Sequence, residues 1–175
     1  MVLKIISRQE IYNGRIIKVV KDHVELQNGI KTVREAVFHK DAAAVVAVDE
    51  NNEILLVTQY RYPIGRDMLE LPAGLVDEGE EPLDAAKREL MEETGYRADK
   101  WKLLASIYAS PGVHNEKIHI FSASNLKRVS DQNLDTDELL AIDKIPFDEA
   151  LQMVNAGKIT DAKTIIGILL FSAGK

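Results

Sequence analysis

Three glutamates, Glu89, Glu92 and Glu93, are so close in the sequence that they must share one small region of surface. On a helix, like charges at i,i+3 and i,i+4 positions repel one another by roughly 0.2–0.5 kcal/mol for each pair, even when exposed. A hard divalent cation among the oxygens would remove this repulsion, and Mg²⁺ is usually held by a few carboxylates together with substrate phosphates. The spacing therefore predicts a site for a divalent metal ion.

The segment that carries these carboxylates is predicted to be a helix. Pro82 suits the first helical position, where its missing N–H costs nothing, and Gly95 is a natural stop. Apolar residues recur at helical spacing between them: Leu83, Ala86 and Leu90. At about 100° per residue, the three glutamates occupy one face beside this apolar stripe. They should therefore lie at the edge of a packed core, with Arg88 one turn before Glu92 and able to hold it in place.

A longer pattern surrounds this helix. From Gly74 to Tyr96 the chain follows the spacing G-x5-E-x7-R-E-U-x-E-E-x-G-U, in which U is an apolar residue and the first E is Glu80. A solvated run of surface charge does not require so many positions at once. The stretch resembles the box of the Nudix hydrolases, which cleave nucleoside diphosphates linked to another moiety. Tyr96 stands where that family usually has an aliphatic residue.

Segments outside the box narrow the resemblance to the ADP-ribose pyrophosphatase branch of that family. They are VREAVFHKDAAAVV (33–46), QYRYP (59–63), LELPAGLVDEGE (69–80), SPGVHNE (110–116, the Pro-Gly loop) and DAKT (161–164). Together with the box they cover most of the chain. The resemblance implies hydrolysis of ADP-ribose to AMP and ribose 5-phosphate, with Mg²⁺, or Mn²⁺ in its place, as the metal.

The resemblance also implies roles for individual residues. The expected metal ligands are Glu89, Glu92, Glu93 and the carbonyl oxygen of Ala73, and Glu93 is counted among the catalytic residues as well. Glu80 and Arg88 are expected to orient these ligands, because metal ligands commonly need fixed outer partners.

Substrate contacts are expected outside the box. Arg34 and Arg61 match arginines that hold phosphate or ribose in this branch, and the planar fork of a guanidinium can bind two phosphate oxygens at once. An ordinary surface ion pair is the alternative for each. Gly112 in the Pro-Gly loop is a third candidate. Tyr12 is expected either to stack on adenine or to pack in the core, whereas Trp101 is expected in the core.

The general base is expected on a loop rather than in the box. The candidates are, in order of preference, Glu138, Glu116 and Asp137, and the alternative for each is an ordinary surface acid. The branch often has a glutamate where Thr136 stands, so the chain departs from the family at a position that matters.

Composition fits an enzyme with one main core. The chain has 175 residues, of which 46% are hydrophobic and 29% are charged. Its net charge of −6 provides no basic surface for binding nucleic acid. The same charge would repel an anionic substrate at long range, so the site must supply local cations. The absence of cysteine excludes disulfides and thiolate chemistry. The longest apolar run, 165–171, is too short to span a membrane, and the first residues lack a signal-peptide core, so cytoplasmic residence is the default expectation.

The order of elements predicts an α+β fold. Strands are expected at 24–27, 30–38, 42–48, 54–59, 102–109, 117–122 and 139–145, helices at 82–94, 147–156 and 161–171, and a polar loop at 126–135. The resemblance implies a Nudix-like α/β/α sandwich with a mixed sheet at 41–175. Residues 1–40 form a small β region, which is too short to hold a core alone.

The apolar residues of that β region predict a homodimer, because they would make a large exposed patch on a monomer. The branch exchanges this region between subunits, in which case Arg34 would serve the partner's site. Other functions remain open at this point: a pyrophosphatase for another nucleotide sugar or a diadenosine polyphosphate, a sensor that binds ADP-ribose without cleaving it, or an assembly that serves only interaction. The intact box argues against the last two.

Overall fold

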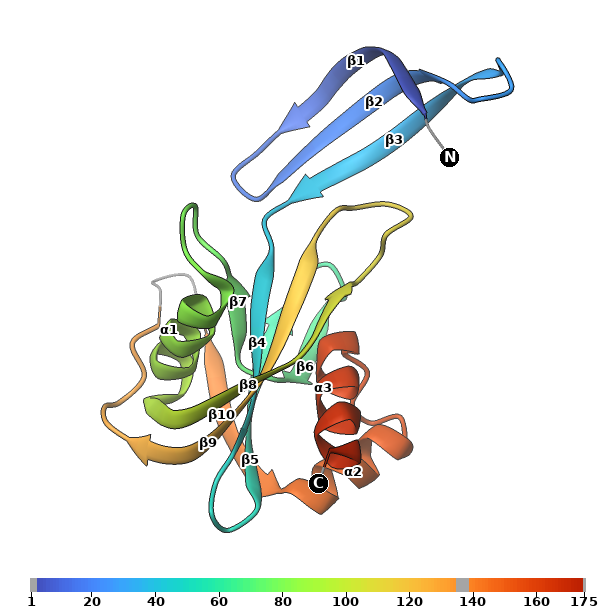
Figure 1. Cartoon of the computed structure of the whole chain (residues 1–175). Helices are drawn as coiled ribbons and strands as arrows, with labels where there is room; N and C mark the ends of the chain where they lie inside the picture. The colour runs from blue at the N-terminus through green and yellow to red at the C-terminus, as the bar shows by residue number, and fades with distance from the viewer. Residues whose placement is uncertain (1–2, 135–138, 175) are drawn as a thin grey trace. The chain divides into compact units, whose positions relative to one another are not determined.

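The computed structural model describes residues 3–134 and 139–174, and the chain divides into two compact units (Figure 1). The N-terminal unit comprises Met1–Asp41 and Tyr108–Lys117. The sandwich unit comprises Ala42–Ile107 and Ile118–Lys175. The sequence-based division placed its boundary at residue 40 and left the Pro-Gly loop with the larger part.

The N-terminal unit is built on a three-stranded antiparallel sheet in the order β1-β2-β3. Its strands are β1 (Lys4–Asn13), β2 (Ile17–Glu25) and β3 (Lys31–His39). The hairpin predicted at Asn28-Gly29 is confirmed as the β2–β3 connection, and Gly29 has a φ of 80°, which glycine adopts without strain.

The Pro-Gly loop is fixed to the end of β3 by hydrogen bonds. The Val37 amide donates to the Val113 carbonyl at 2.9 Å, and the His39 amide donates to Oδ1 of Asn115 at 2.8 Å. These bonds explain why a segment far away in the sequence belongs to the N-terminal unit.

The sandwich unit contains a seven-stranded mixed sheet with the path β10-β5-β4-β9-β8. Its strands are β4 (Ala42–Val48), β5 (Glu53–Arg61), β6 (Arg66–Glu70), β7 (Ala73–Leu75), β8 (Tyr96–Tyr108), β9 (Lys117–Arg128) and β10 (Leu140–Pro146). Its helices are α1 (Pro82–Thr94), α2 (Phe147–Asn155) and α3 (Ala162–Ala173). β4 and β9 run parallel, whereas β5 pairs antiparallel with both β4 and β10, β6 pairs with β5, and β7 pairs with β4.

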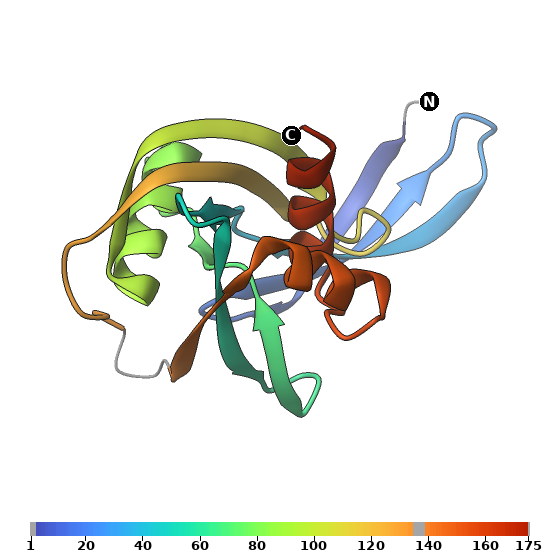
Figure 2. The same cartoon turned by 90° about the horizontal axis from the view of Figure 1, so that it is seen from below.

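Both faces of this sheet are covered, and β4 shows it most clearly because all seven of its residues are buried. Ala43, Val45 and Ala47 pack in one core cluster with buried residues of α1. The alternate residues of β4 pack in the second cluster, which includes residues of α2 and α3. Figures 1 and 2 show α1 on one side of the sheet and the other two helices on the opposite side. The predicted α/β/α sandwich with a mixed sheet is confirmed.

The strands differ from the prediction in several places. The strand expected at 24–27 is β2, which already begins at Ile17 and ends at Glu25. The short strands β6 and β7 were not predicted, because neither is long enough to show a clear alternation of apolar and polar residues. β8 begins at Tyr96, directly after α1, and β9 extends to Arg128, into the segment expected to be a polar loop. Many residues of these two extensions are exposed, so sheet pairing overrides the polar composition there. Within 3–134 and 139–174, no helix is long and apolar enough to cross a membrane.

Candidate metal-binding and catalytic site

The helix α1 positions the box carboxylates. It begins at Pro82 and ends at Thr94. Gly95 caps it, with a left-handed φ of 74° and an amide that donates to the Met91 carbonyl at 2.8 Å. Ala85, Ala86 and Leu90 are fully buried and anchor the helix against the sheet. The predicted helix and both of its ends are therefore confirmed.

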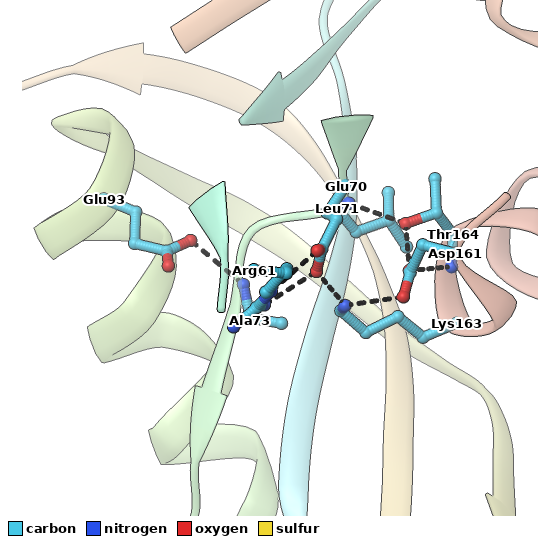
Figure 3. A network of polar contacts seen from close by, with 8 residues as sticks. All are labelled: Arg61, Glu70, Leu71, Ala73, Glu93, Asp161, Lys163 and Thr164. Carbon is cyan, nitrogen blue, oxygen red and sulfur yellow. Dashed lines mark hydrogen bonds and ion pairs between the residues drawn. The ribbon is translucent and has the colours of Figure 1, made fainter. Parts of the chain in front are cut away.

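Glu89 and Glu93 lie on the buried edge of α1, with only 8% and 3% of their surface exposed. Glu92 is more accessible, with 32% of its side chain exposed. The Ala73 amide donates a hydrogen bond to Oε2 of Glu93 at 3.0 Å, which joins the helix to the start of β7 (Figure 3). Buried carboxylates are costly unless they are paired with cations or bind metals, so this edge of α1 requires positive charge.

Gly74 lies directly against one of these carboxylates. A Cβ atom at this position would come within 2.0 Å of Oε1 of Glu89 and within 2.5 Å of its Oε2. No side chain can be accommodated there without moving Glu89. The glycine that opens the box therefore lets the main chain approach the Glu89 carboxylate this closely.

Arg88 is the common partner of the box glutamates. Its guanidinium donates to Glu80 at 3.0 and 3.1 Å, to Glu89 at 2.5 Å, to Glu92 at 3.1 Å and to the Leu75 carbonyl at 2.9 Å. We call Arg88, Glu80, Glu89 and Glu92 the Arg88 cluster. Hydrogen bonding to Glu80 and the other carboxylates raises the pKa of Arg88, and the same bond to Arg88 lowers the pKa of Glu80. One arginine for three carboxylates leaves a surplus of negative charge.

The box does not form a finished metal cage by itself. Among the described residues, no three acidic or histidine side chains converge closely enough to hold a metal ion. The donor set nevertheless suits a hard divalent cation, because it consists of carboxylate oxygens on a buried edge with excess negative charge. Mg²⁺ characteristically takes one or two protein carboxylates and completes its shell with water and substrate phosphates.

Arg61, the expected phosphate ligand on β5, makes a bidentate ion pair with Glu70. Its Nε and Nη2 atoms each donate to a Glu70 oxygen at 2.7 Å, and 38% of its side chain is exposed. Hydrogen bonding to Glu70 raises the pKa of Arg61, and the nearby charges of Asp161 and Glu93 raise it further. Nη1 takes no part in the pair with Glu70 and can donate to another acceptor.

The other expected substrate residues lie in the N-terminal unit. Tyr12 on β1 is 56% exposed, so it is not a core residue. Arg34 on β3 is exposed and donates from Nη1 to the neighbouring Val33 carbonyl at 3.0 Å. Gly112 faces open space, with no atom within 4 Å of a Cβ built there.

The two preferred loop acids have different outcomes. Glu116 lies between two histidines of the N-terminal unit, 3.5 Å from Nδ1 of His39 and 3.8 Å from Nδ1 of His114. Glu138 and Asp137 lie outside the described residues. Trp101 packs against the core cluster around α1, as predicted, and its Nε1 donates to the Ala98 carbonyl at 3.0 Å.

Sequence reasoning assigned no role to three charged residues that lie around Arg61 in the sandwich unit. Glu70 is 2% exposed and contacts both Arg61 and Lys163, and Lys163 also contacts Asp161 (Figure 3). We call these four side chains the Glu70 network. The available signal was a glutamate between two leucines at 69–71, where the alternation of a buried strand does not favour a charge.

Known proteins share much of this sequence and its fold. The family model described as the NUDIX domain matches residues 38–165. The chain is 41% identical to the methanol dehydrogenase activator of Bacillus methanolicus and 39% identical to the ADP-ribose pyrophosphatase of Bacillus subtilis (strain 168). Each alignment covers 94% of this chain and 90% of the relative. A crystal structure described as an ADP compounds hydrolase superposes with a TM-score of 0.86 at 23% identity, covering 99% of this chain and 94% of that one, which supports the fold.

Proposed function

We propose that this chain, which belongs to the NUDIX family, is a Mg²⁺-dependent pyrophosphatase that hydrolyses ADP-ribose to AMP and ribose 5-phosphate. The observation that carries the proposal is the buried edge of α1, where Glu89 lies against Gly74 and Glu93 accepts a hydrogen bond from the Ala73 amide. The carboxylates of this helix carry more negative charge than Arg88 can balance. The ADP-ribose pyrophosphatase of Bacillus subtilis, similar over nearly its whole length, supports the choice of substrate.

The metal ion would be held by Glu89, Glu92, Glu93 and the carbonyl of Ala73. Mg²⁺ or Mn²⁺ bound there neutralises charge on the diphosphate and lowers the pKa of a bound water. Arg88 and Glu80 keep the carboxylates in place through the hydrogen bonds of the Arg88 cluster. The chain's own contribution is therefore to hold oxygen ligands that would otherwise repel one another.

Substrate oxygens would be met by arginine. Nη1 of Arg61 takes no part in the ion pair with Glu70. It can donate to a phosphate oxygen while Nε and Nη2 keep the side chain in position. Arg34, Tyr12 and Gly112 are proposed as further substrate contacts. The exposure of Tyr12 favours stacking on adenine over core packing.

The general base is proposed to be Glu138. A positioned base typically contributes about 10²–10⁴-fold to the rate, so Glu138→Gln should lower kcat by a factor in that range with little change in KM. Higher pH should restore part of the rate, because hydroxide then replaces the base. Glu116→Gln is the comparison, since Glu116 is already engaged between two histidines. If Glu116→Gln abolishes turnover and Glu138→Gln does not, the base belongs to the Pro-Gly loop; Asp137→Asn tests the third candidate.

We also propose that the chain acts as a homodimer through the N-terminal unit. All ten residues of β1 are exposed, and large apolar side chains are among them: Ile5, Ile6, Ile11 and Tyr12. An exposed apolar strand of this length is expected to associate with a partner. Sedimentation at micromolar concentration should give twice the 19.5 kDa chain mass, and a purely monomeric profile would contradict the proposal.

The substrate is tested by turnover of the purified chain without any partner enzyme. The panel contains ADP-ribose, UDP-glucose, GDP-mannose and a diadenosine polyphosphate, each with Mg²⁺ and with Mn²⁺. We expect the highest kcat/KM for ADP-ribose, with AMP and ribose 5-phosphate as products, and complete loss of turnover in EDTA that added Mg²⁺ reverses. A higher kcat/KM for another compound would move the assignment to that substrate. Binding of ADP-ribose without turnover would favour the sensor.

A further inference from the structure

The Glu70 network joins three elements of the sandwich unit at the N-terminal end of α3. Arg61 comes from β5, Glu70 ends β6, and Lys163 lies in the first turn of α3 (Figure 3). The Lys163 ammonium contacts Glu70 and also Oδ1 of Asp161 at 3.0 Å. Asp161 in turn caps α3 by accepting a hydrogen bond from the Thr164 amide at 3.0 Å. The network therefore links three elements of the fold and is not a set of independent surface ion pairs.

Glu70 depends on both of its cations. It is 2% exposed, and burial alone would raise its pKa. The hydrogen bonds from Arg61 and the charge of Lys163 outweigh burial and lower the pKa of Glu70 below its usual value. The carboxylate is therefore ionised in the folded protein at neutral pH, where it holds the Arg61 guanidinium through two hydrogen bonds.

The same network is connected to the metal site by the main chain. The Leu71 amide donates to Oγ1 of Thr164 at 2.8 Å, and the Pro72 carbonyl accepts from the Val45 amide at 2.9 Å. The next amide, that of Ala73, donates to Glu93 at 3.0 Å. Three consecutive residues are therefore fixed between α3 and the box carboxylate.

We propose that Lys163 is a positioning residue for catalysis, which acts on Arg61 through Glu70 without touching the substrate. The inference rests on the proposed function, in which Arg61 binds the diphosphate. Lys163 balances Asp161 and shares Glu70, so Arg61 has one well-defined bidentate partner. Without the ammonium, Arg61 would be the remaining cation of the network. It would be attracted toward Asp161, whose charge already raises the pKa of Arg61. Nη1 would then lose its position.

A double-mutant cycle tests this, because it separates a catalytic coupling from a purely structural role of Lys163. The four proteins are the native chain, Lys163→Met, Arg61→Ala and the double variant, with kcat/KM measured on ADP-ribose. We expect Lys163→Met to lower kcat/KM roughly ten-fold, the low end for loss of an outer partner. In the Arg61→Ala background the same change should cost less than about two-fold, since the side chain that it positions is absent.

Equal factors in the two backgrounds would overturn the proposal, and so would native kcat/KM in Lys163→Met or in Arg61→Ala. Lys163→Arg should retain most of the activity, because it keeps a cation beside both carboxylates. If Lys163→Met does not fold, Lys163→Gln takes its place in the cycle, since its amide can still donate to Glu70.

Lys144→Met is the matched control. Lys144 also bridges two carboxylates, Asp49 at 2.7 Å and Glu53 at 2.9 Å, but it belongs to a different part of the sheet. We expect this change to alter thermal stability and to leave kcat/KM within about two-fold of native, as surface changes usually do.

A readout that does not depend on turnover is the NMR signal of the Arg61 Nε–H group. In the native chain this proton is held by Glu70 and should exchange slowly with solvent. Lys163→Met should broaden it or speed its exchange, and an unchanged signal would contradict the proposal. If the native chain hydrolyses another panel compound instead of ADP-ribose, the proposed substrate fails, and the cycle is measured with that compound.

Discussion

Two charged clusters in the sandwich unit look similar in composition but differ in balance. In the Arg88 cluster, a single arginine faces Glu80, Glu89 and Glu92. In the Glu70 network, two cations face two carboxylates, and the central one, Glu70, is almost completely buried. The first cluster carries surplus negative charge and the second is neutral.

This difference separates a site that needs a ligand from a support that does not. A buried network whose members are all paired can persist without any ligand and gives its members fixed orientations. A cluster with unbalanced carboxylates remains costly until a cation and its phosphate ligands complete it. The main chain at 71–73 lies between the two. The Leu71 amide donates to Thr164, whose hydroxyl donates to Asp161 of the Glu70 network, and the Ala73 amide donates to Glu93, on the same helix as three members of the Arg88 cluster.

The strongest way to break the comparison is to remove the charge of Glu93, which lies beside the Arg88 cluster on the same buried edge of α1 as Glu89. Glu93→Gln keeps the size of the side chain and can still accept from the Ala73 amide, but it loses a charged metal ligand. We expect kcat to fall roughly 100-fold, which corresponds to about 2.7 kcal/mol of transition-state stabilisation. Thermal stability should not decrease, because like-charge repulsion on α1 is relieved.

Asp84→Asn is the control for this change, because Asp84 lies on the same helix but is exposed and paired with Lys87 at 2.9 Å. It should leave kcat unchanged. A Glu93→Gln enzyme with native kcat would show that Glu93 is not a metal ligand. The surplus negative charge on this edge of α1 would then not contribute to catalysis.

The unbalanced cluster could be predicted from the sequence, whereas the neutral one could not. Pro82 and Gly95 fix the ends of α1, and the helical period then places Glu89 and Glu93 on one buried edge. Those are local effects within one element. The Glu70 network instead requires β5, β6 and α3 to meet, and no local pattern specifies how distant segments pair.

The fold shows the same division between local and distant effects. The hairpin at Asn28-Gly29 and the helices were predictable because turn residues, caps and apolar periods act over a few positions. The short strands β6 and β7 and the attachment of the Pro-Gly loop to β3 were missed, because they depend on partners elsewhere in the chain. The contact between Gly74 and Glu89 belongs to the second kind, although the motif already contained both residues.

That contact provides a second test, with a smaller expected effect. Gly74→Ala would place a Cβ atom within 2.0 Å of the Glu89 carboxylate, so Glu89 must move. We expect the Mg²⁺ concentration needed for half-maximal activity to rise roughly ten-fold, as is usual when the support of a metal ligand is disturbed. Gly174→Ala, where the nearest atom would be 3.5 Å away, is the control and should leave the Mg²⁺ dependence unchanged. An unaltered Mg²⁺ dependence in Gly74→Ala would mean that Glu89 does not need its position against Gly74.

The smallest effect is expected from the neutral side, where pH reports on stability. The pKa of Glu70 in the folded protein lies below its ordinary value of 4.5, so the folded state binds fewer protons than the unfolded state in that region. The stabilisation by the ionised Glu70 is therefore complete above pH 4.5 and is lost as the pH falls through the folded-state pKa. Glu70→Gln cannot gain or lose this contribution, because its amide does not titrate.

Urea unfolding of the native chain and of Glu70→Gln at a series of pH values measures this contribution. The native chain should be more stable at pH 7, and the difference should shrink as the pH falls below 4.5 by about 1 kcal/mol, a modest value for hydrogen bonds to a charge because Arg61 is partly exposed. Glu50→Gln, at an exposed turn, should follow the native curve at every pH. A difference between native and Glu70→Gln that stays constant with pH would mean that Glu70 contributes only shape. In that case the neutral network would not owe its rigidity to balanced charge, and the contrast with the Arg88 cluster would rest on burial alone.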